Sequence, residues 1–106
     1  MEFLSSLVYM KLATIRGMLI HHQDCLEMRD RKSFIEAMDS FDYSISLYRE
    51  SILKSYSMDH PLYKLFDDIK KYQVHSRMLI NSFNNSSYFQ ECTSFQKQLI
   101  FEIDSL

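Results

Sequence analysis

Residues 33–53 read SFIEAMDSFDYSISLYRESIL, and this stretch decides the fold of the chain. Its apolar residues recur at alternating intervals of four and three, which is the spacing of one face of an α-helix. Along this stripe lie Phe34, Met38, Phe41, Ile45, Tyr48 and Ile52. Ser33 and Glu36 have the spacing of a capping box, in which each side chain satisfies an unpaired amide at a helix start. We therefore expect a long amphipathic helix that begins at Ser33.

The segment from Leu4 to about Met28 repeats the same spacing and predicts a helix before it. Its apolar stripe consists of Val8, Leu12, Ile15, Leu19, His22 and Leu26. Gly17 lies inside this segment, although glycine costs a helix about 1 kcal/mol relative to alanine. We interpret Gly17 as a position at which a neighbouring backbone approaches closely, rather than as a break in the helix.

Pro61 marks the start of another helix, because proline disfavours helical geometry in the preceding residue and suits the first helical turn. Asp59 or His60 is the candidate cap. The apolar spacing predicts that this third helix runs from Leu62 to Phe83. Its stripe contains Leu62, Phe66, Ile69, Tyr72, Ser76, Leu79 and Phe83.

A shorter terminal helix is predicted from a second capping box, formed by Ser87 and Gln90. Its stripe contains Phe89, Cys92, Phe95, Leu99, Ile103 and Leu106. Chain ends are the elements that undock most readily. This fourth helix is therefore a candidate cover that can be released from a binding surface.

Length and composition limit the fold to one small helical domain. The chain has 106 residues, of which 46% are hydrophobic, and this is enough for a single core. We expect one domain over residues 1–106. One glycine and one proline leave few residues for the tight turns of a β fold. The expected fold is all-α, an antiparallel bundle of three to four helices with short connections.

The charge pattern gives no sign of a nucleic-acid or membrane partner. The formal net charge is −2, so the chain has no positive excess with which to hold phosphate backbones. No run approaches the roughly 20 apolar residues that span a bilayer, and the first residues do not form a basic leader with a cleavage site. These patterns predict a cytoplasmic protein without membrane insertion. Cys25 and Cys92 are then expected to be reduced and buried.

The polar residues show no arrangement typical of an enzyme or a metalloprotein. His21 and Cys25 are four residues apart and can meet on one helix face, but the other histidines and cysteines lack the paired spacings of a zinc site. His22 lies on the apolar stripe without an accompanying nucleophile, so we interpret it as a neutral, packed side chain at the core edge. We expect no catalytic residue, no metal and no cofactor.

One alternative gives His75 a chemical role. The segment from Val74 to Leu79 is loosely similar to the histidine segment of the lactose-type IIA phosphocarriers of sugar phosphotransfer systems, which are small helical proteins with a phosphorylated histidine on a late helix. That resemblance implies that His75 accepts phosphate. Under this alternative, His75→Ala abolishes phosphate transfer.

The order of the helices resembles that of the small export chaperones of flagellar and related type III secretion systems, of the FliT and FlgN kind. The resemblance covers about residues 4–100. It rests on a long first helix, a short charged connection and a second helix that opens on an aromatic residue, in the segment DRKSFIEAM from Asp30 to Met38. Phe34 stands where that family usually has a tryptophan-like residue. The resemblance implies that the chain shields an amphipathic helix of an export substrate by helix-in-groove recognition.

The surplus apolar residues of the third and fourth helices are the predicted binding surface for a partner protein. The six proposed partner-binding residues are Phe66, Ile69, Leu79, Phe95, Leu99 and Ile103. Two alternatives use the same surface. An immunity protein or small inhibitor would occupy a partner's functional surface, and a homodimer would bury the surplus stripe against a second copy. The prediction is a non-enzymatic binding protein, with a secretion chaperone or adaptor preferred.

Overall fold

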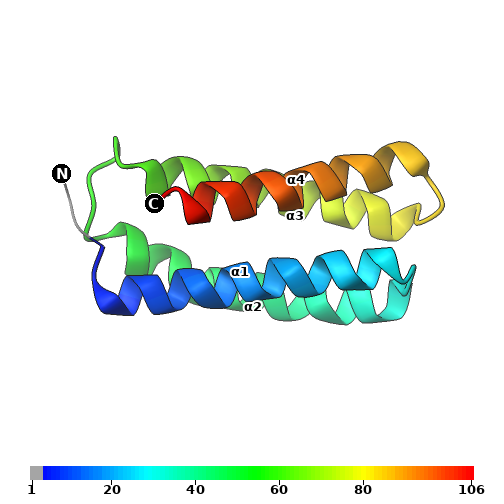
Figure 1. Ribbon diagram of the computed structural model, residues 1–106, viewed down its shortest axis with the longest axis horizontal. Coiled ribbons are helices and arrows are strands. Elements are labelled where there is room, and N and C mark those ends of the chain that lie inside the picture. Colours follow the sequence, from blue (N-terminus) through cyan, green and yellow to red (C-terminus); the bar gives the residue numbers. More distant parts are fainter. Residues whose placement is uncertain (1–3) are drawn as a thin grey trace.

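The computed structural model describes residues 4–106 and contains four α-helices in that range (Figure 1). They are α1 (Ser6–Glu27), α2 (Arg31–Leu53), α3 (Pro61–Asn81) and α4 (Ser86–Asp104). No strand is present among the described residues. The all-α prediction is confirmed, and the structure gives the number of helices as four.

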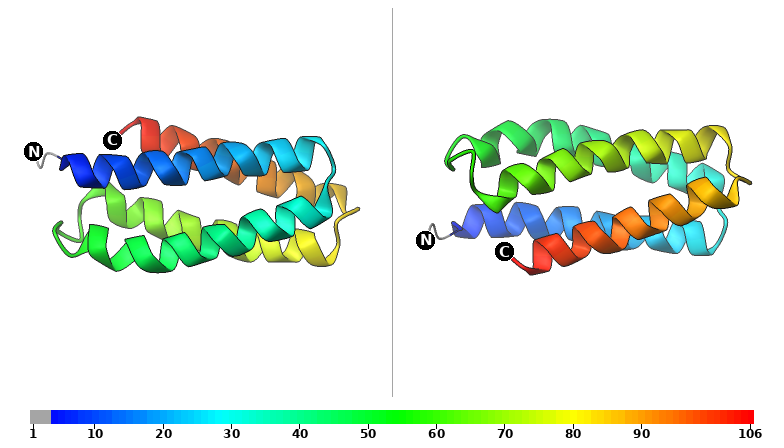
Figure 2. Two further views of the ribbon diagram at one scale, coloured as in Figure 1. Left: turned by 90° about the horizontal axis from the view of Figure 1, so that it is seen from below. Right: turned by 90° about the horizontal axis from the view of Figure 1, so that it is seen from above.

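The helices form an up-down-up-down bundle. α1 packs on α2 and α4, and α3 packs on the same two helices from the opposite corner. Figures 1 and 2 show that neighbours run in opposite directions and that α1 and α3 lie diagonally. The bundle measures 43 × 21 × 19 Å. Short connections between successive helices produce this antiparallel order, because they leave no room for a chain crossover.

The core is built from the predicted apolar stripes. Every member of the α1 stripe is buried, as is every member of the α2 stripe except Tyr48, which is half-buried. The α3 stripe is buried up to Leu79, and Phe83 is half-buried beyond the end of the helix. Each large apolar side chain removed from water contributes about 1.5–3 kcal/mol, so these stripes hold the four helices together.

Both predicted capping boxes are wrong, because an earlier residue caps each helix. The Asp30 carboxylate accepts hydrogen bonds from the Ser33 backbone amide (3.1 Å) and the Ser33 hydroxyl (2.7 Å). Ser33 therefore lies inside α2 and cannot serve as its cap. In the same way the Asn85 side chain accepts from the Tyr88 amide (3.1 Å), so α4 begins one residue before Ser87. Asp and Asn are strong caps and supply the oxygen three residues ahead of the amide that needs it.

The start of α3 agrees with the prediction, whereas its end does not. The imidazole Nδ1 of His60 accepts a hydrogen bond from the Leu62 amide at 3.1 Å, and Pro61 occupies the first turn. α3 ends at Asn81 instead of Phe83. The Ser82 amide bonds to the Leu79 carbonyl three residues back, at 3.0 Å, which is a tightened last turn rather than a further α-helical one.

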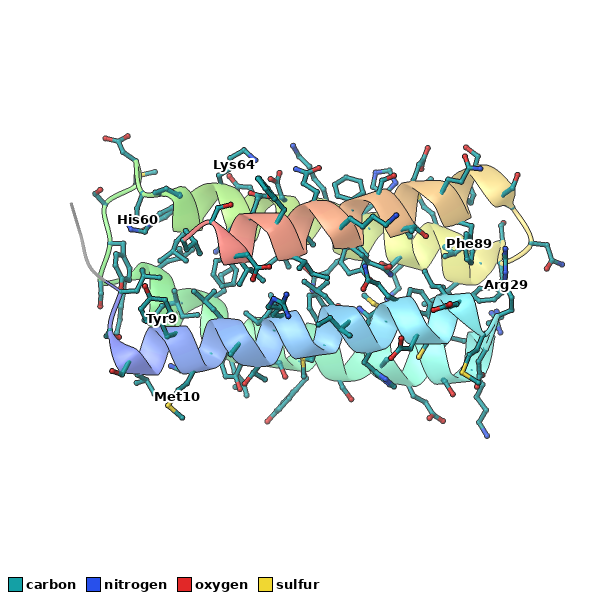
Figure 3. The ribbon with its side chains drawn as sticks, viewed as in Figure 1. Tyr9, Met10, Arg29, His60, Lys64 and Phe89 are labelled. Atoms are coloured by element: carbon teal, nitrogen blue, oxygen red, sulfur yellow. The ribbon has the colours of Figure 1, made fainter. Side chains whose placement is uncertain are left out.

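The turn between α1 and α2 is a Schellman motif that places a non-glycine residue in the left-handed region. Arg29 has φ 55°, its amide bonds to the Leu26 carbonyl (3.1 Å), and the Asp30 amide bonds to the Cys25 carbonyl (3.0 Å). The Arg29 guanidinium lies 3.8 Å from the ring centroid of Phe89 (Figure 3). This cation–π contact ties the turn to the first half of α4.

Gly17 does not mark a close approach within the chain. A Cβ at this position would meet no neighbouring heavy atom within 4 Å. The prediction of a close backbone contact is therefore wrong for the single chain, because Gly17 lies on the exposed side of α1 and not on the stripe that meets the other helices.

Candidate functional site

The six predicted partner-binding residues do not form an exposed surface. Phe66, Ile69, Leu79 and Leu99 are at most 1% exposed and belong to the core, because they are the residues by which α3 and α4 pack into the bundle. Phe95 and the side chain of Ile103 are half-buried. A partner could reach the whole set only if α4 left the bundle.

Exposed large apolar side chains gather instead on α1 and α2. Over about four turns of α1, the exposed residues include no Asp, Glu, Lys or Arg. They are Ser6, Leu7, Tyr9, Met10, Ala13, Thr14, Gly17, Ile20 and His21. The expectation that the apolar surplus lies on the third and fourth helices is thus corrected. Interface centres are depleted in charge, so this part of α1 has the composition of a contact surface.

The two charged residues within this stretch of α1 point to its flanks. The Lys11 ammonium donates to the Ser51 hydroxyl of α2 at 3.0 Å. The Arg16 guanidinium forms an ion pair with the Asp104 carboxylate of α4, at 2.7 Å. Both are half-buried at the seams with the neighbouring helices, which leaves the outward side of α1 uncharged.

A groove of about 520 Å³ lies between α1 and α2. Most of the residues that line it are small or polar. The lining consists of Thr14, Gly17, Met18, His21, His22, Ser33, Glu36, Ala37 and Ser40. Tyr43 and Leu47 continue this side of α2 at helical spacing from Ser40, and they are 67% and 54% exposed.

We call this surface the α1–α2 face, and define it by Leu7, Met10, Thr14, Gly17, Ser40, Tyr43 and Leu47. Figure 3 shows Met10 projecting away from the bundle. The pairing of Lys11 with Ser51 sets the antiparallel register, so the first half of α1 lies beside the second half of α2. Large apolar residues therefore gather at one end of the face, and small residues form a hollow at the other.

A polar centre lies inside the core and joins all four helices. The His22 Nδ1 atom of α1 is 2.9 Å from the Tyr72 hydroxyl of α3, and its Nε2 atom is 3.4 Å from the Ala37 carbonyl of α2. The Gln96 amide of α4 donates to the Tyr72 hydroxyl at 3.0 Å. Because Ala37 offers only an acceptor, we assign the proton to Nε2, and Tyr72 then donates to Nδ1.

Burial fixes the ionisation of this centre. His22 is completely buried, and desolvation lowers its pKa to about 4. Desolvation likewise raises the pKa of Tyr72. The Gln96 Oε1 atom is buried without a hydrogen-bond partner among the described residues. His22 is thus a neutral packed side chain as predicted, although it lies at the centre of the core and not at its edge.

The cysteines are buried free thiols, as predicted. Cys25 Sγ lies 3.8 Å from Nε2 of the exposed His21, and Cys92 Sγ lies 4.0 Å from the Ser76 hydroxyl. Burial raises the pKa of Cys92 to about 11, which keeps this thiol protonated and a poor nucleophile at neutral pH. Within residues 4–106, no three His, Cys, Asp or Glu side chains are grouped so that they could hold a metal ion.

His75 lies at the surface between α3 and α4. Its Nδ1 atom is 3.1 Å from a Glu91 carboxylate oxygen, and its ring lies 4.9 Å from that of Phe95. A carboxylate that hydrogen-bonds one ring nitrogen fixes the orientation of an imidazole. If His75 accepts phosphate, as the phosphocarrier resemblance implies, Nε2 is the ring nitrogen that the contact with Glu91 leaves for it.

Comparisons with known proteins add no relative. No family model, curated protein or solved structure matches the chain. None of the helices described in residues 4–106 is long and apolar enough to cross a membrane. What supports a function is therefore the chain's own surface and core.

Two functional features were missed by the apolar pattern. Gln96 has the spacing of the α4 stripe, four residues after Cys92 and three before Leu99, but the apolar pattern passed over it because it is polar. The uncharged side of α1 did leave a signal, because Lys11 and Arg16 are the only charged residues between Leu4 and Gln23. A surface helix with so little charge is expected to have a second face to bury.

Proposed function

We propose that this chain is a non-enzymatic protein-binding module that receives an apolar or amphipathic helix of a partner on its α1–α2 face. The observation that carries the proposal is the uncharged exposed side of α1, which extends over about four turns. Contiguous exposed apolar surface of this kind marks a protein interaction site more often than a solvated face.

The shape of the α1–α2 face suits a helix. Small residues such as Gly17, Ala37 and Ser40 leave a hollow between α1 and α2. Packed helices lie about 8–10 Å apart, at a distance that depends on the side chains at the contact. Large residues of the partner would fill this hollow. Met10 and Leu47 would then pack on the partner's flanks, which is the usual arrangement of helix-in-groove recognition.

Within this class we prefer a cytoplasmic secretion chaperone or adaptor. What supports this choice is the resemblance in helix order to the small type III export chaperones, together with a surface that would shield an aggregation-prone helix. An immunity or inhibitor protein would use the same face on a toxin or enzyme. The identity of the captured partner separates the two: an export substrate supports the chaperone, and a toxin supports the inhibitor.

Affinity capture from the native organism tests the proposal when matched surface variants are compared. We expect Met10→Glu and Leu47→Glu each to reduce capture of the partner at least tenfold, because each places a charge in a face that must lose its water. Val74→Glu is the control, since Val74 is 57% exposed on α3, diagonally opposite α1. Equal capture by all three variants would show that the α1–α2 face is not the binding site.

The phosphocarrier alternative keeps one supporting observation, the His75–Glu91 pair. It is tested by phosphate transfer from a phosphorylated carrier protein to the purified chain. Transfer that is present in the wild type and lost in His75→Ala supports the alternative. Absence of any phosphorylated His75 in the wild type removes it.

A further inference from the structure

The α1–α2 face is an exposed apolar surface in the single chain, and such a surface drives association. We propose that a second copy of this chain covers the face when the partner is absent, through antiparallel packing of α1 on α1, with Met10 of each copy seated over Gly17 of the other. The inference rests on the proposed function, because it assigns an occupant to the same face.

The exposed side of α1 is complementary to itself in size. A two-fold axis perpendicular to the helix, placed between Ala13 and Thr14, brings Met10 opposite Gly17, because these two residues lie on one face of α1. Met10 is 67% exposed and flexible, whereas Gly17 has open space above its Cα. One end of α1 thus supplies the projection and the other end supplies the notch. An isologous dimer requires both features on one surface.

The distribution of charge also favours a second copy. A two-fold axis places each residue near it beside its own equivalent, so any charge at the centre of such an interface would face a like charge. The exposed residues of α1 on either side of the proposed axis are Met10, Ala13, Thr14 and Gly17, none of which is charged. Lys11 and Arg16 are held at the flanks by partners within their own chain.

A stable dimer must bury enough surface on each copy. A stable interface of standard size takes about 800 Å² from each partner. That is about one eighth of the 6505 Å² accessible surface of the chain. Large apolar residues that could contribute to it are Leu7, Met10 and Ile20 of α1 with Tyr43 and Leu47 of α2, which are 38–67% exposed.

Sedimentation equilibrium on the full chain tests the inference. The main variant, Gly17→Leu, is chosen because it should stabilise the fold while it weakens the dimer. Gly17→Leu fills the notch, while the open space at Gly17 lets the new side chain stand in solvent. We expect the wild type to dimerise and Gly17→Leu to weaken dimerisation at least tenfold. The same variant should raise the melting temperature of dilute, monomeric protein, because leucine favours the helix more than glycine does. Val74→Glu should leave the dimer unchanged.

Cysteine pairing tests the register. Met10→Cys and Gly17→Cys are mixed and oxidised, and we expect the mixed 10–17 disulfide to form faster than either homodimeric disulfide, because only that pair lies opposite across the axis. If the wild-type protein stays monomeric at about 1 mM, its dimer has a Kd weaker than about 1 mM, and the inference is overturned. A dimer that is unaffected by Gly17→Leu overturns it as well, since it would use another face.

The failure of this inference is distinguishable from the failure of the proposed function. A monomeric wild type whose partner capture still depends on Met10 removes the second copy and keeps the binding face. A dimer that depends on Gly17, in a chain whose partner capture is indifferent to Met10 and Leu47, keeps the second copy and removes the proposed function.

Discussion

His22 couples the stability of the bundle to pH. Its pKa is about 4 in the folded chain and near 6.5 in an unfolded one. Between these values the unfolded chain takes up a proton that the folded chain does not. The free energy of unfolding should therefore be constant above about pH 6.5 and fall by about 3 kcal/mol as the pH decreases to 4. Urea unfolding at a series of pH values measures this slope.

His22→Gln is the control for that prediction. The glutamine carbonyl can accept from the Tyr72 hydroxyl as Nδ1 does, but the side chain does not titrate. The other three histidines are present in both proteins, so the difference between the two stability curves isolates His22. Parallel curves between pH 4 and 6.5 would mean that His22 is protonated in the folded bundle.

The polar centre also predicts unequal effects for two neighbouring substitutions. Tyr72→Phe leaves both the His22 Nδ1 and the Gln96 amide nitrogen without a partner in the core, and should cost about 2 kcal/mol or more. Gln96→Leu removes the unpartnered Oε1 and keeps the bond between Tyr72 and His22, so stability should change by less than about 1 kcal/mol. Thermal unfolding of both variants at pH 7 checks this order, and a larger loss for Gln96→Leu would contradict it.

Individual residues were predictable where packing follows apolar spacing. Leu19 and Phe41 recur at helical intervals and are fully buried. Gln96 is equally buried, but its place in the core depends on a hydrogen bond to Tyr72, which is 24 residues away in sequence. A periodic pattern records which side of its own helix a residue occupies. It carries no information about a polar partner on another helix.

At the scale of the helices, two substitutions test which residue caps α4: Asn85, as the structure shows, or Ser87, as the sequence pattern predicted. Asn85→Ala removes the side chain that accepts from the Tyr88 amide and should cost about 1 kcal/mol. Ser87→Ala changes a solvent-exposed residue inside the helix and should change stability by less than about 0.5 kcal/mol. Chemical denaturation gives both values. The reverse order would restore the capping box at Ser87.

The existence of each helix was predictable, and its first residue was less so. Ser33 and Glu36 match a capping box, while Asp30 and Ser33 match a simple cap with the same spacing. Both arrangements satisfy local chemistry, so the sequence alone does not choose between them. The Schellman turn after α1 decides the matter, because it delivers Asp30 to the start of α2 with its carboxylate near the free amides.

At the scale of the whole molecule, α4 is the helix with the fewest buried side chains. Only Cys92, Gln96 and Leu99 of α4 are buried, compared with nine residues of α3. We therefore expect α4 to open at a lower free energy than the rest of the bundle. Amide hydrogen exchange followed by NMR should show smaller protection factors in α4 than in α2. Equal protection would mean that α4 does not act as a releasable cover for Phe66 and Ile69.

The assignment of surfaces was the least predictable part of the molecule. The apolar stripes of α3 and α4 looked broad enough to bind a partner protein as well as the core. In the bundle each helix packs on two neighbours, and these two contacts bury most of the stripe. α1 also has two neighbours, α2 and α4, and still exposes Leu7 and Met10. Which of two apolar sides faces the solvent depends on how far a helix is rotated about its own axis in the bundle. That rotation cannot be predicted from a single sequence.

The order in which the helices pack has a consequence for how quickly the chain folds. Three of the four helix pairs that touch are joined by a short connection, and only the contact between α1 and α4 brings together distant parts of the chain. Loops close fastest between near neighbours, so folding should be complete within microseconds to milliseconds. Temperature-jump relaxation would measure this rate. The closing of α4 against α1 is then the step that completes the bundle, so the contact between the helices farthest apart in sequence is expected to form last.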